Sequence, residues 1–320
     1  MPDKLSDSAA EAVDSSLPPL PVPPPRLTVA LIEAHGEACE ALALADPVKA
    51  VHGVRKGFKR LRALLRLAGT AREREVAHLA RASRRALAHT ARHLAQARDA
   101  AAREDALDDL VAKVGLAPTI RRAAGRAFAK PGIDAPGIDA PGASAPDGGV
   151  GAHRAALDAQ MDALGKALPR LGAGLDDKAL ITALVAGYAK ARRAGRDVDP
   201  QDDESLHELR KEVVAQRYQM ELVVFAWPAL GHIWVDQLQR LRDKLGKHHD
   251  LSVLRALAEA HPVRADGKPL WRTQLLAAIE ARQEKLALSA LLLYARLFAE
   301  KPMAFRRRLS AYMSAVSERK

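Results

Sequence analysis

Residues 51–67 read VHGVRKGFKRLRALLRL, and they decide the fold class. At 100° per residue, the apolar side chains of this stretch gather on one face of a helix and the basic ones on the other. The apolar face consists of Val54, Phe58, Leu61, Leu64 and Leu65. The opposite face consists of His52, Arg55, Lys56, Lys59, Ala63 and Arg66. The stretch therefore predicts an amphipathic helix that buries one face and presents cations on the other.

The basic face contains no acid, and like charges at these spacings repel one another in an isolated helix. A solvated charged face is the ordinary interpretation of one such run. A second basic helix, expected over 72–97, argues against that interpretation. Its basic face consists of Arg74, His78, Arg81, Arg85, His89 and Arg92, with Val76, Leu79, Leu87 and Leu94 facing away. Packed antiparallel, the two helices are expected to bring both basic faces to one groove.

The composition favours an all-α protein with a sizeable core. The 320 residues are 48% hydrophobic but only 4% aromatic, and Ala and Leu dominate. Cys39 is the only cysteine, which excludes an intrachain disulfide and a thiolate metal cluster. His35 lies one turn before it, and we interpret both as packing residues. No apolar run is long enough for a membrane span, and the amino terminus does not resemble a secretory signal, so we expect a cytoplasmic protein.

The charge is strongly basic and unevenly distributed. The net charge is +11, and residues 52–92 contain twelve Lys or Arg against two acids, a local excess of +10. Such a concentrated basic region predicts a polyanionic partner. Nucleic acid, anionic lipid and inorganic polyphosphate all satisfy this requirement.

The segments outside these helices suggest how the chain is organised. Residues 1–25 are acidic and then proline-rich, and we expect a disordered tail. Residues 131–149, PGIDAPGIDAPGASAPDGG, repeat a short unit that is too poor in apolar residues to fold, and we expect a linker. The other helices are expected at about 28–45, 103–129 with a break near 115–118, 153–168, 178–194, 229–249 and 251–316, the last interrupted at 262–269. We expect the leucine-rich run 288–293 to belong to the core.

The basic pattern returns in the second half of the chain. Residues 206–223, LHELRKEVVAQRYQMELV, place apolar residues at Leu206, Leu209, Val213 and Met220. The other face consists of His207, Arg210, Lys211, Val214, Arg217 and Tyr218. The helix that follows carries Arg240, Lys244, Lys247 and His248 on one side. This duplication predicts two pseudo-symmetric repeats of antiparallel helices, 26–130 and 150–320, around a shared basic groove or pore.

These paired stretches resemble the signature of the CHAD family, the conserved histidine α-helical domain. In that family each half contains a V/L-H-x-L-R-x-x-x-K/R-R-L-R-like basic helix, and an R-D or L-N/H-D segment comes later in each half. Here that later segment is Arg98-Asp99 in the first half and His249-Asp250 in the second. The resemblance covers about residues 27–300 outside the low-complexity insert, and it assigns 26–320 to one CHAD domain.

The resemblance implies an all-α fold with a basic central groove or pore, and binding of inorganic polyphosphate, often at polyphosphate granules in bacteria. By motif, the binding residues that carry over are His52, Arg55, Lys56, Lys59, Arg62, Arg66, His207, Arg210, Lys211 and Arg217. The sequence departs from the family at Val214 and Ala215, where a basic pair is usual, and at Gln216. We therefore expect the first half to dominate binding.

The chemistry of the ligand agrees with this pattern. Polyphosphate is a flexible chain with about one charge per phosphate and no bases, so recognition needs cations at repeating intervals. One helical turn advances about 5.4 Å, which lets cations one turn apart follow an extended polyanion. Crowding by cations favours neutral histidine and a bound phosphate favours the protonated form, so binding is expected to tighten as the pH falls towards 6.

Two alternatives remain open at this point. A nucleic-acid-binding protein would be expected to add aromatic platforms for bases, and none accompanies the basic faces; weak nonspecific binding is still expected from charge alone. A metal-dependent phosphohydrolase, or a metal-binding protein, is suggested by His248-His249-Asp250. Those histidines lie among arginines with few acids to orient them, so we expect no enzyme activity, no cofactor and no metal.

Overall fold

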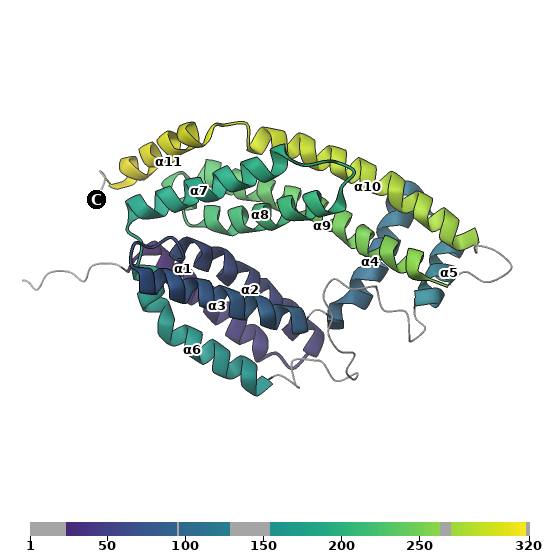
Figure 1. The fold of residues 1–320 in the computed structure, drawn as a ribbon, viewed down its shortest axis with the longest axis horizontal. Coiled ribbons are helices and arrows are strands. Elements are labelled where there is room, and N and C mark those ends of the chain that lie inside the picture. The colour runs from purple at the N-terminus through teal and green to yellow at the C-terminus, as the bar shows by residue number, and fades with distance from the viewer. Residues whose placement is uncertain (1–23, 95, 129–153, 263–269, 318–320) are drawn as a thin grey trace, which may run out of the picture.

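The computed structural model describes residues 24–94, 96–128, 154–262 and 270–317, and within them it contains helices and no strands (Figure 1). The all-α prediction is confirmed. Most of the predicted tail and all of the predicted linker lie outside the described residues. The elements are α1 (Arg26–Leu42), α2 (Pro47–Ala68), α3 (Arg74–His93), α4 (Gln96–Val114), α5 (Pro118–Phe128), α6 (Arg154–Ala173), α7 (Asp177–Arg196), α8 (Asp203–Glu221), the short 3₁₀ helix η1 (Val224–Ala226), α9 (Pro228–Ala260), α10 (Leu270–Leu297) and α11 (Pro302–Ser317).

Helix α2 is the stretch that decides the fold, and its limits have local causes. The Asp46 carboxylate accepts hydrogen bonds from the backbone N–H groups of Val48 and Lys49, at 2.9 and 3.1 Å. Pro47 occupies the first helical position, where its missing N–H costs nothing. Such an N-cap contributes about 1 kcal/mol to helix stability. All five residues of the predicted apolar face are buried, as expected.

Helices α1 and α2 pack with almost no space between their backbones. A Cβ atom on Gly53 would lie 2.6 Å from the Cβ of Ala41, and one on Gly57 would lie 2.7 Å from the Cβ of Ala38. Two glycines one turn apart on α2 therefore meet two alanines on α1. This close contact fixes the rotation of α2, so that its basic face points away from α1 and towards the second half of the chain.

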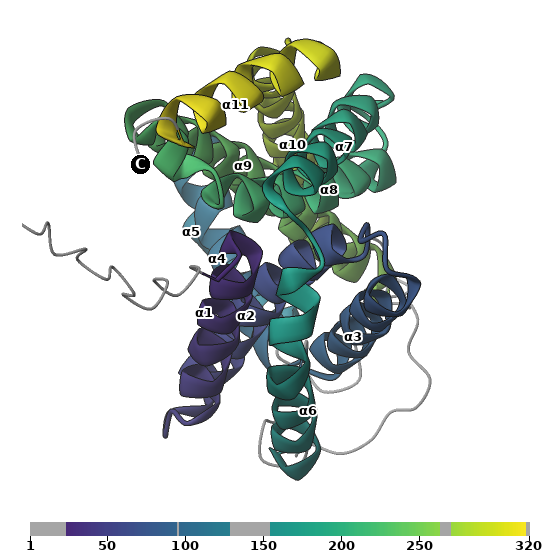
Figure 2. The ribbon, with the colours of Figure 1, turned by 90° about the vertical axis from the view of Figure 1, so that its left-hand side faces the viewer.

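The helices form two bundles, one containing α1, α2, α3 and α6 and the other α7 to α11 (Figures 1 and 2). This packing crosses the predicted division of the sequence. Helix α6 follows the linker but packs against the first bundle, where Arg154 donates a hydrogen bond to the carbonyl of Leu42 at 2.7 Å. Helices α4 and α5 precede the linker but pack against α9 and α10. The two segments on either side of the linker are thus exchanged between the bundles.

Helix α8 crosses α2 at the contact between the bundles. The side-chain amide of Gln219 donates to the carbonyl of Ala63 at 2.9 Å, and Arg66 pairs with Glu212 at 2.5 Å. The two basic helices of the predicted duplication therefore lie against each other. Their pseudo-symmetry stays a prediction.

The buried residues form two clusters. The main one spans both bundles, and a smaller one joins α4 and α5 to the carboxyl-terminal part of α9 and the amino-terminal part of α10. The predicted core run 288–293 was only partly right. Leu288 and Leu292 are 63% and 58% exposed, whereas Ala287 and Ala290 are buried. Successive residues of a helix point to different sides, and packing buries only one of those sides.

Candidate functional site

Basic side chains surround a hollow where α2 faces α8 and α9. A cavity of about 390 Å³ is lined there by residues of all three helices. They are His52, Arg55, Lys56 and Lys59 from α2, Arg217 and Tyr218 from α8, and Gln239 and Arg242 from α9. The predicted basic faces of α2 and α8 therefore do meet around one hollow.

A second cavity, of about 180 Å³, adjoins the first and shares Arg55 and Lys59 with it. Its other lining residues are Ala102 and Arg103 from α4, Arg210 from α8, and His249, Asp250 and Val253 from α9. We call the two cavities together the basic groove. Its lining contains seven Lys or Arg residues and one carboxylate, Asp250. Four helices contribute to it, two from each side of the linker.

The ring of Tyr218, which lines the groove, is covered by a neighbouring side chain and is not exposed to a ligand. Tyr218 is buried, and the guanidinium of Arg217 lies over its ring, 4.7 Å from the centroid. Arg217 is in turn held by Glu221 at 3.2 Å. Glu221 is also 3.7 Å from Arg60, which pairs with Glu37 at 2.6 Å. This network orients Arg217 across the ring, so the ring has no free face on which a base could stack.

Two histidine rings lie close together beside the groove, tilted by 33° to each other. The rings of His207 and His249 lie 4.3 Å apart between centroids. Burial, the neighbouring His207 and Arg210 lower the pKa of His249 to about 4. Burial, Lys211 and Arg210 also lower the pKa of His207, whose Nδ1 is buried without a hydrogen-bond partner in the described part of the chain. Both rings are therefore neutral near pH 7. His52 is exposed at the entrance on α2.

The predicted side of α9 does not reach the groove. Lys247 binds Asp109 of α4 at 2.8 Å, and Lys244 donates to Ser289 of α10 at 3.2 Å. Arg240 is exposed and lines neither cavity. Lys244 and Lys247 line neither cavity because α10 and α4 pack against the side that carries them, and a binding role for this side of α9 stays a prediction. The opposite flank, with Gln239, Arg242 and His249, faces α2 instead.

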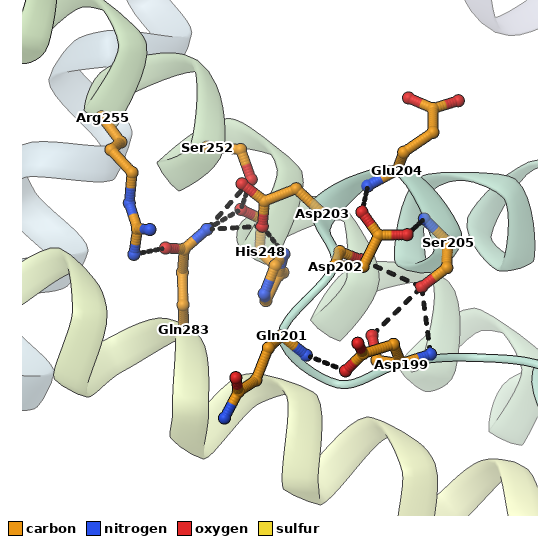
Figure 3. A network of polar contacts seen from close by, with 10 residues as sticks. All are labelled: Asp199, Gln201, Asp202, Asp203, Glu204, Ser205, His248, Ser252, Arg255 and Gln283. Atoms are coloured by element: carbon orange, nitrogen blue, oxygen red, sulfur yellow. Dashed lines mark hydrogen bonds and ion pairs between the residues drawn. The ribbon is translucent and has the colours of Figure 1, made fainter.

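His248 has a structural role that Figure 3 shows. It is 4% exposed, and its Nδ1 lies 3.7 Å from the carboxylate of Asp203 at the start of α8. Gln283 of α10 lies beside it, donating to Ser252 at 2.9 Å and accepting from Arg255 at 2.6 Å. The nearby acidic loop caps α8, since Asp202 accepts from the backbone N–H of Ser205 at 3.0 Å. The network joins α8, α9 and α10, and His248 lines neither cavity.

Three other predicted residues line neither cavity, and two of them form ion pairs with carboxylates. Arg66 shares the buried carboxylate of Glu212 with Lys190, at 2.5 and 2.8 Å. Lys211 pairs with Glu208 one turn away on α8. Arg62 is half-buried between α2 and α3. The basic face predicted for α2 is therefore divided, and only its first two turns line the groove.

The predicted basic face of α3 also lies outside both cavities. Its six residues are exposed, and one of them, Arg81, donates to the carbonyl of Gly69 at 3.0 Å. Sequence reasoning missed Arg103 and Arg242, which line the groove, and Arg84, which faces α2. The pattern of α9 could have indicated Arg242, which lies two turns before His249 on the same side of the helix. Nothing in the sequence pointed to Arg103. The side chains of Arg98 and Asp99 lie outside those that the structure describes.

The arrangement can bind an anion. Among the described residues, no group of three His, Cys, Asp or Glu side chains gathers where it could hold a metal ion. His35 and Cys39 pack against α6, where the carbonyl of Met161 lies 2.8 Å from His35 Nε2. Every described helix is too short or too polar to span a lipid bilayer.

Comparison with known proteins places this geometry in a family. A search of curated proteins found no match. Among solved structures, PptA from Streptomyces chartreusis is similar, with a TM-score of 0.56 and 19% sequence identity over 87% of this chain and 100% of that one. At that identity the likeness concerns the fold. The family model of the CHAD domain matches residues 30–259, which include α2, α8 and the lining residues of the basic groove. The chain therefore belongs to the CHAD family.

Proposed function

We propose that the protein binds inorganic polyphosphate in the basic groove and that it does so without catalysing a reaction. The observation that carries this proposal is the composition of the groove, in which seven Lys or Arg from four helices surround two adjoining cavities with one carboxylate. Separate helices would not gather so many cations around a hollow for stability alone, because like charges oppose packing. A bound polyanion removes that opposition.

The groove fits a polymer of phosphates better than a single anion. Lys56 and Lys59 lie about one turn apart on α2, while Arg210 and Arg217 lie two turns apart on α8. Cations at these intervals can contact successive phosphates of an extended chain. Arginine adds paired N–H donors for two phosphate oxygens, and lysine adds a point charge.

The same features favour polyphosphate over nucleic acid. Nucleic-acid grooves add aromatic faces on which bases stack, with about 1–3 kcal/mol for each base. Here Tyr218 is buried beneath Arg217. A chain without bases loses nothing in such a groove. RNA is then expected to bind through its backbone charge alone, weakly and with strong dependence on salt.

The proposal extends to the role in the cell. A groove with cations, neutral histidines and one carboxylate is suited to holding phosphate rather than to acid and base chemistry, which needs titrating groups placed on the reacting atoms. We infer that binding directs the protein to polyphosphate granules in the cytoplasm.

The test is calorimetric titration with long-chain polyphosphate at ~150 mM salt, a near-physiological ionic strength. The groove variant replaces Lys56, Lys59 and Arg242 with Gln. The matched control replaces Lys285, Arg296 and Lys301 with Gln, removing the same charge from exposed positions outside the groove. The groove variant is expected to bind about a hundredfold more weakly, from roughly 1 kcal/mol for each of three lost contacts. The control is expected to bind almost as the wild type does.

Competition with single-stranded RNA of matched charge separates the remaining possibilities. Polyphosphate that RNA barely displaces supports the proposal. Equal affinity for both polymers, with equal losses in the two variants, would show a generic cationic surface and contradict it.

A further inference from the structure

Helix α2 carries arginine beyond the end of the basic groove. Arg62 and Arg66 lie one and two turns past Lys59, and neither lines either of the two cavities of the groove. Two hydrogen bonds fix the antiparallel alignment of this part of α2 with α3. Arg81 donates to the carbonyl of Gly69 at 3.0 Å, and Arg55 donates to the carbonyl of Ala91 at 3.4 Å. Interpolation between these contacts places Arg84 opposite the turn that holds Arg62 and Arg66.

These arginines are partly buried against one another. Arg62 and Arg84 are both half-buried, and the Nε of Arg62 is buried without a hydrogen-bond partner among residues the structure describes. Burial, followed by the nearby Arg84 and Arg92, lowers the pKa of Arg62. Burial and the nearby Arg66 lower the pKa of Arg84 in the same way. Each guanidinium is therefore less stable in its charged form than it would be in water, which is the condition that a bound anion relieves.

A carboxylate already occupies one end of this cluster. Glu212 of α8 is buried and binds both Arg66 and Lys190, at 2.5 and 2.8 Å. Its one negative charge is thus shared by two cations. Its charge also acts on Arg84, but burial and the nearby Arg66, Arg85 and Arg81 outweigh it, so the pKa of Arg84 stays lowered. At the other end, Arg92 follows Ala91, the residue that Arg55 contacts, and Arg55 itself lines the groove.

We propose that Arg62, Arg84 and Arg92 form a second phosphate-binding site between α2 and α3, continuous with the basic groove at Arg55 and ended by Glu212. The proposal rests on the proposed function, since it extends the path of the same polymer. A long polyphosphate chain then follows α2 for four turns, and Glu212 takes the place of its last phosphate at Arg66. Short chains fill only the groove.

The test compares two neighbouring arginines of α3. Arg84→Gln removes a charge from the cluster, whereas Arg85→Gln removes the same charge from an exposed position that lines neither cavity. Arg84→Gln is expected to weaken the binding of long-chain polyphosphate by about three- to tenfold, as the loss of one charged contact does, and Arg85→Gln by clearly less. A second measurement, the melting temperature without ligand, is expected to stay unchanged or rise in Arg84→Gln because repulsion between guanidinium groups is relieved.

The results separate this proposal from the proposed function. If the groove variant loses binding while Arg84→Gln and Arg85→Gln bind equally well, the second site is wrong and the groove stands. A lower melting temperature of Arg84→Gln with unchanged affinity would show a structural arginine and also overturn it. If the wild type does not bind polyphosphate at all, the second site is tested separately by measuring whether inorganic pyrophosphate raises the melting temperature of the protein. Stabilisation that Arg84→Gln loses and Arg85→Gln keeps supports the site, and no stabilisation overturns it.

Discussion

The neighbouring rings of His207 and His249 make the stability of the protein depend on pH. The pKa of His249 is lowered to about 4 in the folded protein, against 6.5 for an unperturbed histidine. Between these values the unfolded chain holds more protons than the folded one, so the free energy of unfolding falls as the pH falls from about 6.5 to about 4. Allowing for partial solvent access, the loss is on the order of 2 kcal/mol. In the His249→Gln variant, the free energy of unfolding is expected to fall by about 2 kcal/mol less over the same pH range.

Urea unfolding of both proteins at pH 7.5 and pH 4.5 measures this difference. Equal losses of stability in wild type and variant would contradict the assignment.

The lowered pKa values also change the expectation for the ligand. Since His249 lines the groove, polyphosphate bound there should raise its pKa and draw in a proton, but only below about pH 6. The tightening expected near pH 6 from sequence alone therefore moves to lower pH for this pair.

Which cations line the groove could be predicted for α2 and not for α9, and the reason lies at the residue scale. The apolar face of α2 occupies one side, so the basic face can only be opposite. The buried leucines of α9, such as Leu238, Leu241 and Leu245, leave a basic flank on each side. One flank carries Arg240 and Lys244, and the other carries Arg242 and His249. Periodicity cannot tell which flank meets α2, because that depends on where α10 packs.

At the scale of the element, the α1–α2 pair depends on having no side chain at Gly57. A Cβ there would lie 2.7 Å from the Cβ and 3.1 Å from the Cα of Ala38, and the backbone cannot yield without separating the helices. Gly57→Ala is therefore expected to lower the free energy of unfolding by about 1–3 kcal/mol, despite the better helix propensity of alanine. Chemical unfolding followed by circular dichroism measures this change.

Gly36 provides the control within the same pair. It lies in α1, and a Cβ added there meets nothing within 4 Å. Gly36→Ala is expected to stabilise the protein by up to about 1 kcal/mol, as alanine does in a helix. If both changes stabilise, the close approach of α1 and α2 does not limit the fold. The helices themselves were predictable from periodicity, but this glycine–alanine contact was not, because it needs the partner helix and its register.

At the scale of the whole molecule, the sequence predicts the helices better than it predicts how they assemble. The two bundles exchange segments across the linker, with α6 in the first and α4 and α5 against α9 and α10. The low-complexity segment suggested a division at that point, but its composition does not determine which bundle receives each helix. The consequence for the groove is that Arg103, on one of the exchanged helices, forms part of its wall.

The smaller buried cluster indicates that α4, which carries Arg103 of the groove, opens more easily than the rest of the molecule. Helices α4 and α5 contribute five of its buried residues, and Leu116 in the turn between them adds a sixth. These residues are separate from the main core, although Asp109 of α4 binds Arg282 at 2.7 Å and Lys247 at 2.8 Å. With less apolar area buried, this unit should open at a lower free energy than α1 and α2. Polyphosphate bound at Arg103 and Arg210 should hold it closed. Hydrogen exchange is therefore expected to be faster in α4 and α5 than in α2, and polyphosphate should slow exchange in α4. If amide hydrogens of α4 exchange as slowly as those of α2, the molecule opens as one unit. If polyphosphate does not change the exchange rate in α4, this helix does not contact the bound polymer.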